Sequence, residues 1–218
     1  PVYIDILQQI REGYIDEEKK KILQGYVKRT YDSDKMNGCV PTKLFAIRSK
    51  TDYTNNMMFK KLDEKEYVFD ITTHKNSTNI KEIGRKLTKE EQYNCSQLTE
   101  TEKQFQLNFL TNNSPCSQVL RLKKGASVMC IVNLDIDNSI CNGSQGIIED
   151  IIETEPQHII VVRFTNGIVK HICPYHWQSQ EYPCISISQY PLTLAWALTI
   201  HKIQGATLNM AEMDIGQS

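Results

Sequence analysis

The sequence lacks three features that would each point directly to a functional class. Its 218 residues carry 25 Lys and Arg against 26 Asp and Glu, so the basic surface typical of nucleic-acid-binding domains is absent. Any nucleic-acid contact must therefore be local. No apolar run approaches the ~18 residues of a membrane span, and the first residues lack the layout of a signal peptide, so we expect no membrane contact. No G-x-x-x-x-G-K-[ST] phosphate loop occurs.

Paired cysteine motifs are also missing. The seven cysteines form no Cys-x-x-Cys pair, and several lie inside apolar runs, which predicts reduced, buried thiols in an intracellular protein. One zinc set can be drawn, from His171, Cys173, His176 and Cys184. Its spacing is irregular and no second pair supports it, so we expect no metal site.

The amino-terminal third has an α/β pattern. Residues 2–12 (VYIDILQQIRE) have helical periodicity and precede Gly13, and Asp16 begins a second, charged helix. Residues 42–47 (TKLFAI) are nearly all apolar, as in a covered parallel strand. Ser49 and Asp52 fit a capping box for a helix to about Leu62, giving half of a βαβ unit.

The middle of the chain changes character at about Arg121. Residues 63–120 are polar, with one predicted helix over 99–109 capped by Thr99. After Arg121 come four or five short β-branched runs separated by turns, and Thr165-Asn-Gly167 is a strong hairpin signal. This pattern predicts a small β-barrel, because closure hides the strand edges.

An α/β pattern returns after Tyr190 in TLAWALTIHKIQGAT, where an apolar strand ends in a polar turn before a short helix. Such a turn presents free N–H groups, and Thr199, His201 and Lys202 can all donate hydrogen bonds to an anion. The alternative is an ordinary turn with solvated side chains. Trp196 lies within the apolar strand, so we expect it in the core rather than stacked on a base.

These residues carry a family resemblance. The stretch PLTLAWALTIHKIQGATL resembles motif V (A-x-A-x-T-x-H-K-S-Q-G-x-T) of superfamily 1B DNA helicases of the Pif and RecD type. It departs at Ile203, where the family usually has Ser. PTKLFAIRSKTDYTN resembles the family's T-K-L-F-x-T-N-x-x-V-D-x-x-N segment, with Arg48 in place of the first Asn, Thr51 in place of Val and Asn55 retained.

Two more segments fit in chain order. VYIDILQQIREG resembles the helix after motif IV, and LKKGASVMCIVNLDIDNSICNGSQGII resembles the start of the inserted SH3-like barrel called 2B. The resemblance implies a RecA-like α/β second motor domain, 2A, over 1–120 and 189–218, with the barrel over 121–188. It also implies a fragment of a longer protein, inactive alone, because the Walker A, Walker B and arginine motifs would lie outside it.

The resemblance implies roles for individual residues. Thr199 and His201 would contact the backbone of single-stranded DNA, while Gln204 and Gly205 would lie beside a nucleotide. Lys202 either contacts phosphate or is solvated. At the family's DNA-track positions, Arg48 could gain a phosphate contact, and Asn55 either touches DNA or is a surface helix residue. ATP and Mg²⁺ would be bound mainly by an amino-terminal motor domain of the same protein.

The resulting hypothesis is the carboxyl-terminal motor and DNA-binding region of an ATP-dependent helicase that translocates 5′ to 3′ on single-stranded DNA and acts in replication or repair. The alternatives are a non-catalytic module that binds single-stranded nucleic acid or a partner, and a barrel-containing RNA-binding protein. We expect a monomer inside the cell. It would be cytoplasmic if viral, and nuclear or mitochondrial if eukaryotic. The Ile-, Asn- and Lys-rich composition suggests an AT-rich genome, such as that of a large DNA virus.

Overall fold

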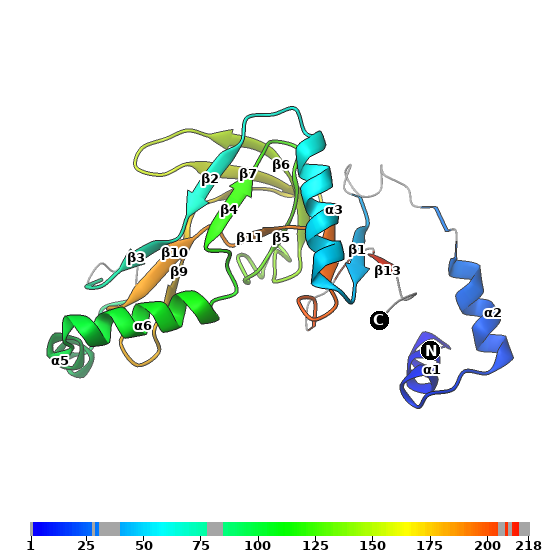
Figure 1. Ribbon diagram of the computed structural model, residues 1–218, viewed down its shortest axis with the longest axis horizontal. Coiled ribbons are helices and arrows are strands. Elements are labelled where there is room, and N and C mark those ends of the chain that lie inside the picture. The colour runs from blue at the N-terminus through cyan, green and yellow to red at the C-terminus, as the bar shows by residue number, and fades with distance from the viewer. Residues whose placement is uncertain are drawn as a thin grey trace. The chain divides into compact units, whose positions relative to one another are not determined.

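The computed structural model describes residues 2–27, 29–30, 40–77, 85–204, 208 and 211–213 (Figure 1). The chain divides into two compact units, residues 1–32 and 33–218. Among the described residues, no helix has the length and hydropathy needed to cross a membrane.

The first unit contains two helices, α1 (Val2–Arg11) and α2 (Glu17–Tyr26). Gly13 follows α1 with a φ of +85°, a left-handed conformation that glycine adopts without strain. The Asp16 side chain caps α2 by accepting a 2.8 Å hydrogen bond from the Lys19 backbone N–H. Both helices begin and end close to the predicted positions, so these local signals are confirmed.

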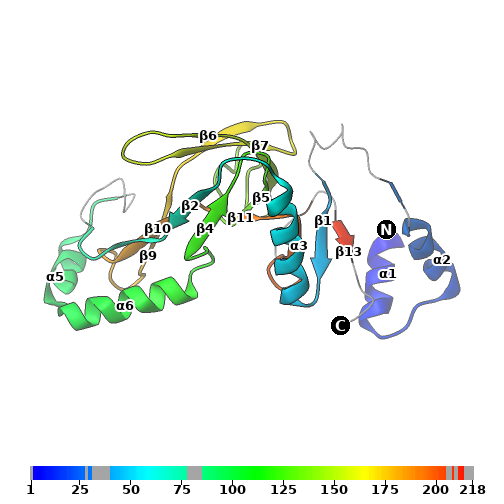
Figure 2. The same ribbon diagram turned by 45° about the horizontal axis from the view of Figure 1, so that its top comes forward.

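The second unit contains a three-stranded parallel sheet. Its central strand is β1 (Thr42–Phe45), which pairs with β12 (Ala197–Thr199) on one side and β13 (Ala211–Met213) on the other. The helix that follows β1, α3 (Arg48–Lys61), packs beside β1 and β12 (Figure 2). The predicted strand and its parallel pairing are confirmed.

The predicted start of α3 is wrong in detail. The helix begins at Arg48, and its N-cap residue Ile47 makes no side-chain capping bond. Ser49 therefore lies inside the first turn and cannot act as the cap of a capping box.

The remaining strands form antiparallel sheets. The largest has the order β11-β5-β6-β7-β8, and two smaller ones have the orders β3-β10-β9 and β2-β4. Their bounds are β2 Tyr67–Asp70, β3 Thr72–His74, β4 Val119–Leu122, β5 Ser127–Cys130, β6 Gln145–Ile152, β7 Ile159–Phe164, β8 Val169–Ile172, β9 Tyr175–Gln178, β10 Ser186–Gln189 and β11 Leu192–Leu194. The hairpin predicted at Thr165-Asn-Gly167 connects β7 to β8, with Gly167 at a φ of +85°. The closure of these strands into an SH3-like barrel stays a prediction.

Among the described residues between β3 and β4, two helices occur, α5 (Lys89–Gln97) and α6 (Glu100–Asn113). Each begins with a complete capping box, formed by Thr88 with Glu91 and by Thr99 with Glu102. The predicted cap at Thr99 is confirmed, whereas α5 was not foreseen.

The domain boundary at residue 121 stays a prediction, and the strands on its two sides are paired with each other. Residue 121 lies inside β4, which pairs with β2 along its whole length. β3 likewise pairs with β10. Residues 67–74 are therefore hydrogen-bonded to strands that the sequence assigned to the inserted barrel or its border.

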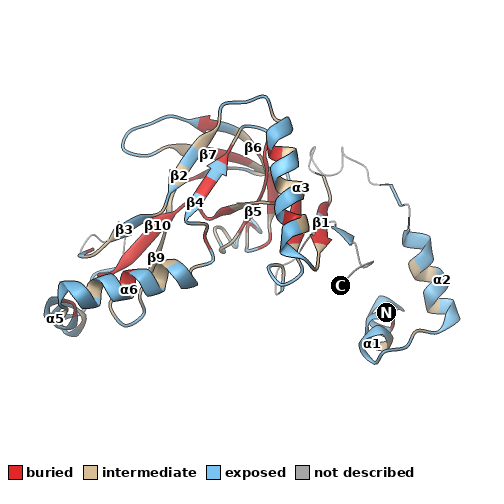
Figure 3. Ribbon diagram, viewed as in Figure 1, coloured by how far each residue is buried: buried red, intermediate tan, exposed pale blue. Residues whose placement is uncertain are grey.

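Among the described residues of the second unit, the buried apolar side chains form three clusters. Figure 3 marks the buried parts of the strands and helices in red. The largest lies between the antiparallel sheet and α3, and it includes Phe59, Leu122, Phe164 and Trp196. Trp196 is only 6% exposed, which confirms its predicted place in the core. A smaller cluster joins the two kinds of sheet, since it contains Leu44 of β1, Met129 of β5 and Leu198 of β12.

The expectation that all cysteines are reduced is wrong for one pair. Cys95 of α5 and Cys184, just before β10, form a disulfide with a Cα–Cα distance of 6.3 Å. The two lie 89 residues apart in sequence and meet in one buried cluster, a proximity that no local spacing reveals. Cys130 is a free buried thiol, and burial raises its pKa to about 12. The neutral thiol is thus strongly favoured there.

Candidate nucleic-acid interface

A cavity of about 630 Å³ opens at the carboxyl edge of the parallel sheet. β1 ends at Phe45 and β12 at Thr199, and these two residues are partners in the parallel register. The segments that leave the two strands, Ala46 to α3 and the turn after Thr199, therefore line the same cavity. Open α/β sheets commonly bind ligands at this edge.

The five residues predicted to bind DNA all line this cavity. They come from two distant segments of the sequence, residues 48–55 and residues 199–202. They are Arg48 and Asn55 of α3, Thr199 at the end of β12, and His201 and Lys202 in the following turn. The structure brings these side chains together, while their contact with DNA stays a prediction.

The turn after β12 is held by backbone bonds and by one apolar side chain. The N–H of Lys202 donates to the carbonyl of Thr199 at 3.0 Å, and the N–H of Ile200 donates to Phe45 at 3.1 Å. Ile203 packs against the cluster that contains Leu44, Met129 and Leu198. Because Ile203 packs inward, it anchors the turn at the position where the motif that this segment resembles has a serine.

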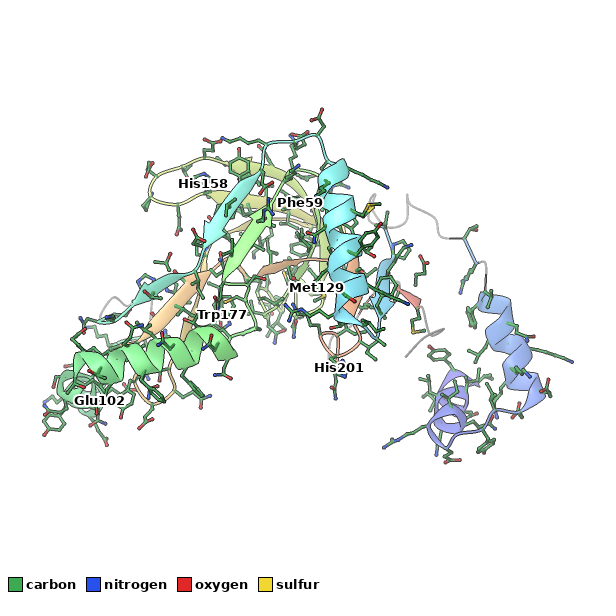
Figure 4. The ribbon with its side chains drawn as sticks, viewed as in Figure 1. Phe59, Glu102, Met129, His158, Trp177 and His201 are labelled. Atoms are coloured by element: carbon green, nitrogen blue, oxygen red, sulfur yellow. A yellow bond between two sulfur atoms is a disulfide. The ribbon has the colours of Figure 1, made fainter. Side chains whose placement is uncertain are left out.

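His201 and Lys202 are exposed on this turn. Figure 4 shows His201 below α3, with its side chain extending away from the ribbon. An imidazole and an ammonium side by side at the cavity are hydrogen-bond donors suited to phosphate oxygens. The geometry allows both to reach an anion without rearrangement of the buried strand.

Asn55 makes two hydrogen bonds to β12. Its Nδ2 donates to the Ala197 carbonyl at 2.8 Å, and its Oδ1 accepts from the Ala197 N–H at 2.9 Å. The amide is therefore already bonded to the protein backbone, and the side chain fixes the strand that leads into the turn. The sequence left two interpretations of Asn55 open, a DNA contact or a surface helix residue, and neither included these hydrogen bonds to Ala197.

The cavity also has charged residues that the sequence analysis did not select. Arg48 Nε lies 3.5 Å from Asp52 Oδ2, one helical turn further along α3. Arg121 of β4 also lines the cavity and pairs with Glu66 at 2.5 Å. Arg121 was missed because the sequence placed it at the start of a separate domain, and only the β2–β4 pairing brings it here.

Thr51 is a further wall residue with an unusual environment. It is 6% exposed, and its hydroxyl has no hydrogen-bond partner among the described residues. The related helicases usually have Val at this position, and Thr has nearly the same shape. Thr51 thus fills an apolar site and leaves its polar atom unpaired, which costs stability.

The residues predicted to lie near a nucleotide are placed only in part. Gln204 is exposed at the end of the turn, where its N–H donates to the His201 carbonyl at 3.3 Å, and it does not line the cavity. Gly205 lies outside the described residues. Within the described part of the chain, no three His, Cys, Asp or Glu side chains are placed to hold a metal ion.

Comparisons with known proteins agree with the sequence resemblance. Residues 106–151 match the family described as "DNA helicase Pif1, 2B domain". The ATP-dependent DNA helicase PIF1 of Homo sapiens is 29% identical over 217 residues, covering 99% of this chain and 29% of the relative. That of Xenopus laevis is 38% identical over 105 residues, covering 47% and 16%. The chain thus spans less than a third of either relative.

Solved structures show the same fold. The Pif1 helicase of Candida albicans matches with a TM-score of 0.65 and 24% identity, over 99% of this chain and 48% of that one. Bacteroides Pif1 matches in a complex with ADP-AlF4 (TM-score 0.64, 20% identity, 99% and 43%) and bound to single-stranded DNA (TM-score 0.54, 22% identity, 100% and 43%). The α/β fold class predicted from the sequence, RecA-like with a 2B insertion, is confirmed. By sequence and by fold, the chain is similar to DNA helicases of the Pif1 type.

Proposed function

We propose that this chain is the carboxyl-terminal motor and DNA-binding region of an ATP-dependent DNA helicase. In this proposal the full protein translocates 5′ to 3′ on single-stranded DNA and unwinds duplexes. The observation that carries the proposal is the convergence of five DNA-binding candidates on one cavity, Arg48, Asn55, Thr199, His201 and Lys202. The ssDNA complex of the Bacteroides relative supports the choice of ligand.

The chemistry of the cavity suits the backbone of a single strand better than a particular base sequence. Thr199, His201 and Lys202 offer hydroxyl, imidazole and ammonium donors along one short turn. Such groups bind phosphate oxygens, and phosphate contacts position a protein without reading sequence. Since the chain as a whole is nearly neutral, we expect modest affinity with a clear salt dependence.

The proposed coupling to ATP depends on the rest of the protein. The turn after β12 presents His201 to the cavity, and Gln204 lies at its other end. In our proposal a nucleotide bound mainly by an amino-terminal motor domain contacts Gln204 and Gly205. Movement of that domain on hydrolysis then shifts the turn along the DNA.

The primary test is binding of a fluorescently labelled oligo-dT to the purified chain, measured by anisotropy at several salt concentrations. We expect binding that weakens with salt, and a His201→Ala, Lys202→Ala double variant that binds at least tenfold more weakly. Lys20→Ala, an exposed charge change in the first unit, serves as the control and should bind like the wild type. Equal binding by the double variant would overturn the assignment of the cavity.

The enzymatic part has a separate test. The purified chain should hydrolyse no ATP, and turnover by the pure chain would contradict its role as half of a motor. In the longer protein, tailed duplexes should be unwound only when the single-stranded tail is on the 5′ side of the duplex. Binding of DNA without any ATPase in the longer protein would instead support the non-catalytic binding module.

A further inference from the structure

The chain crosses from one sheet to the other at a short buried segment. Residues Ala195–Ala197, here called the crossover joint, connect β11 of the antiparallel sheet to β12 of the parallel sheet. The N–H of Ala195 donates to the Ser127 carbonyl of β5 at 2.9 Å. The Thr42 hydroxyl of β1 donates to the Ala195 carbonyl at 2.6 Å. One residue of the crossover joint is thus bonded to both sheets.

A second buried side chain extends this connection. Nε2 of Gln145, the first residue of β6, donates to Thr42 Oγ1. Gln145 is 3% exposed and Thr42 is fully buried. The Thr42 hydroxyl has one proton, which it donates to Ala195, so it can only accept from Gln145. The bonds therefore run in one direction, from Gln145 through Thr42 to the crossover joint.

Gln145 is itself positioned by the antiparallel sheet. Its backbone lies opposite Met129 of β5, and its carbonyl accepts a 2.9 Å hydrogen bond from the Thr165 N–H beyond β7. Hydrogen bonds thus connect three antiparallel strands, through Gln145 and Thr42, to Ala195. Ala195 lies only four positions before Thr199. Thr199 and the turn after it line the proposed DNA cavity.

Core stability alone does not account for a glutamine at this place. Its Oε1 is buried and has no hydrogen-bond partner among the described residues. An unpaired buried acceptor costs stability, and an apolar side chain of similar length would avoid that cost. What the amide adds over an apolar side chain is the donor to Thr42.

We propose that Gln145 is a positioning residue for DNA binding. Through Thr42 it fixes the crossover joint, and it thereby sets where Thr199, His201 and Lys202 stand at the cavity. The inference rests on the proposed function, because it assumes that this cavity binds single-stranded DNA. In this proposal the antiparallel sheet is connected, by hydrogen bonds through Thr42, to the turn that is proposed to contact DNA.

The test uses nearly isosteric variants of the 218-residue chain. Gln145→Met removes the donor together with the unpaired acceptor, so we expect Tm to be kept or raised. Thr42→Val breaks the same connection, and Thr42→Ser retains the hydroxyl. At a fixed salt concentration and well below Tm, oligo-dT should bind about threefold to tenfold more weakly to the Met and Val variants. The Ser variant should bind like the wild type.

A matched control is Ser186→Ala, which removes a buried hydroxyl bonded to Ser77, away from the crossover joint. It should lower Tm without changing the affinity for DNA. Hydrogen exchange across residues 197–204 should be faster in Gln145→Met and Thr42→Val but not in Ser186→Ala. Unchanged affinity and unchanged exchange in Gln145→Met would overturn the inference while the proposed function stands. A wild-type chain that binds no oligo-dT would overturn the proposed function, and this inference with it.

Discussion

The side-chain amide of Asn55 is bonded to both backbone polar groups of Ala197. Nδ2 donates to the carbonyl at 2.8 Å and Oδ1 accepts from the N–H at 2.9 Å. Ala197 begins β12, so these bonds hold the start of the strand against α3. Two residues later the strand reaches Thr199 and the cavity. Asn55 can thus affect DNA binding without touching DNA.

Substitution of Asn55 should therefore reduce both stability and binding. Asn55→Ala leaves the Ala197 N–H and carbonyl without their side-chain partner, and an unpaired buried group costs about 1–3 kcal/mol. We expect a lower Tm and an affinity for oligo-dT weakened by roughly threefold to tenfold, measured by thermal melting and anisotropy. Asn55→Asp keeps the acceptor for the Ala197 N–H but places a carboxylate oxygen against the Ala197 carbonyl, so it should be no more stable and bind no more tightly than Asn55→Ala.

The control for this prediction is Asn56→Ala. Asn56 also lines the cavity but is exposed on α3. Its loss should leave Tm nearly unchanged. If Asn55→Ala bound DNA as tightly as the wild type at temperatures where both are folded, the positioning role of Asn55 would be excluded.

Asp52 should weaken DNA binding in the wild-type chain. Its carboxylate lies 3.5 Å from Arg48 Nε at the cavity, where it partly neutralises the guanidinium and repels phosphate. Asp52→Asn should bind oligo-dT about 1.5- to 5-fold more tightly near 0.1 M salt. Glu17→Gln, which breaks a similar exposed helix pair with Lys20 outside the cavity, should not. Weaker binding by Asp52→Asn would contradict a phosphate contact at Arg48.

Lys202 should make one phosphate contact with single-stranded DNA, and the salt dependence of binding should reveal it. Each contact to a single strand adds about 0.7 to the slope of log affinity against log salt. Lys202→Ala should therefore reduce the magnitude of the slope by about 0.7, as measured from anisotropy titrations at four or more salt concentrations. A slope unchanged from the wild type would favour the other reading of Lys202, a solvated side chain.

The ionised carboxylate of Asp135 should stabilise the folded chain to an extent that depends on pH. Its carboxylate is bonded by Lys170 and by the side chain and backbone of Asn138, and these partners, Lys170 foremost, lower its pKa to about 2. In an unfolded chain the pKa of Asp is about 3.9. Because the folded pKa is the lower one, the contribution is present above pH ~4 and is lost as the pH falls towards 2.

Thermal melting of Asp135→Asn beside the wild type tests this expectation. The variant should melt at a lower temperature at pH 6, and the difference should shrink as the pH falls from about 4 towards 2. Asp137→Asn makes the same change in net charge two residues away and should show no such convergence. A Tm difference between Asp135→Asn and the wild type that stayed constant from pH 6 to pH 2 would rule out the effect.

Local signals in the sequence predicted local structure well. The cap at Thr99, the hairpin before Gly167 and the polar turn after Thr199 each depend on a few neighbouring residues, and each is present. Where a local signal failed, at Ser49, the helix began two residues earlier than predicted, with Ile47 rather than Ser49 at the N-cap position. Element types were thus easier to predict than their ends.

Contacts between distant segments were not predictable from these signals. Arg121 reaches the cavity only because β4 pairs with β2, and Gln145 meets Thr42 across 103 positions of sequence. Neither periodicity nor turn composition specifies which strands pair. The turn chemistry alone indicated Thr199, His201 and Lys202 as donors to an anion. The motif resemblance added Arg48 and Asn55 and thus supplied the long-range information that the residues alone did not.

The disulfide between Cys95 and Cys184 predicts a large effect of reductant on stability. It closes a long loop, since the two residues lie 89 positions apart. Such a link typically contributes about 2–4 kcal/mol, partly by restricting the unfolded chain. For a protein of this size, that corresponds to a fall in Tm on the order of 5–15 °C when the link is removed. Thermal melting with and without dithiothreitol measures this difference directly.

Two variants separate the disulfide from other effects of reduction. A Cys95→Ala, Cys184→Ala double variant should melt at the same temperature with and without dithiothreitol. Cys116→Ser changes a free thiol in the same buried cluster, and its Tm should still fall on reduction, as in the wild type. Alkylation of the unfolded, unreduced chain, followed by peptide mass spectrometry, should leave only Cys95 and Cys184 unmodified. Modification of both would show that the pair is reduced, and the intracellular thiols expected from the sequence would then be correct.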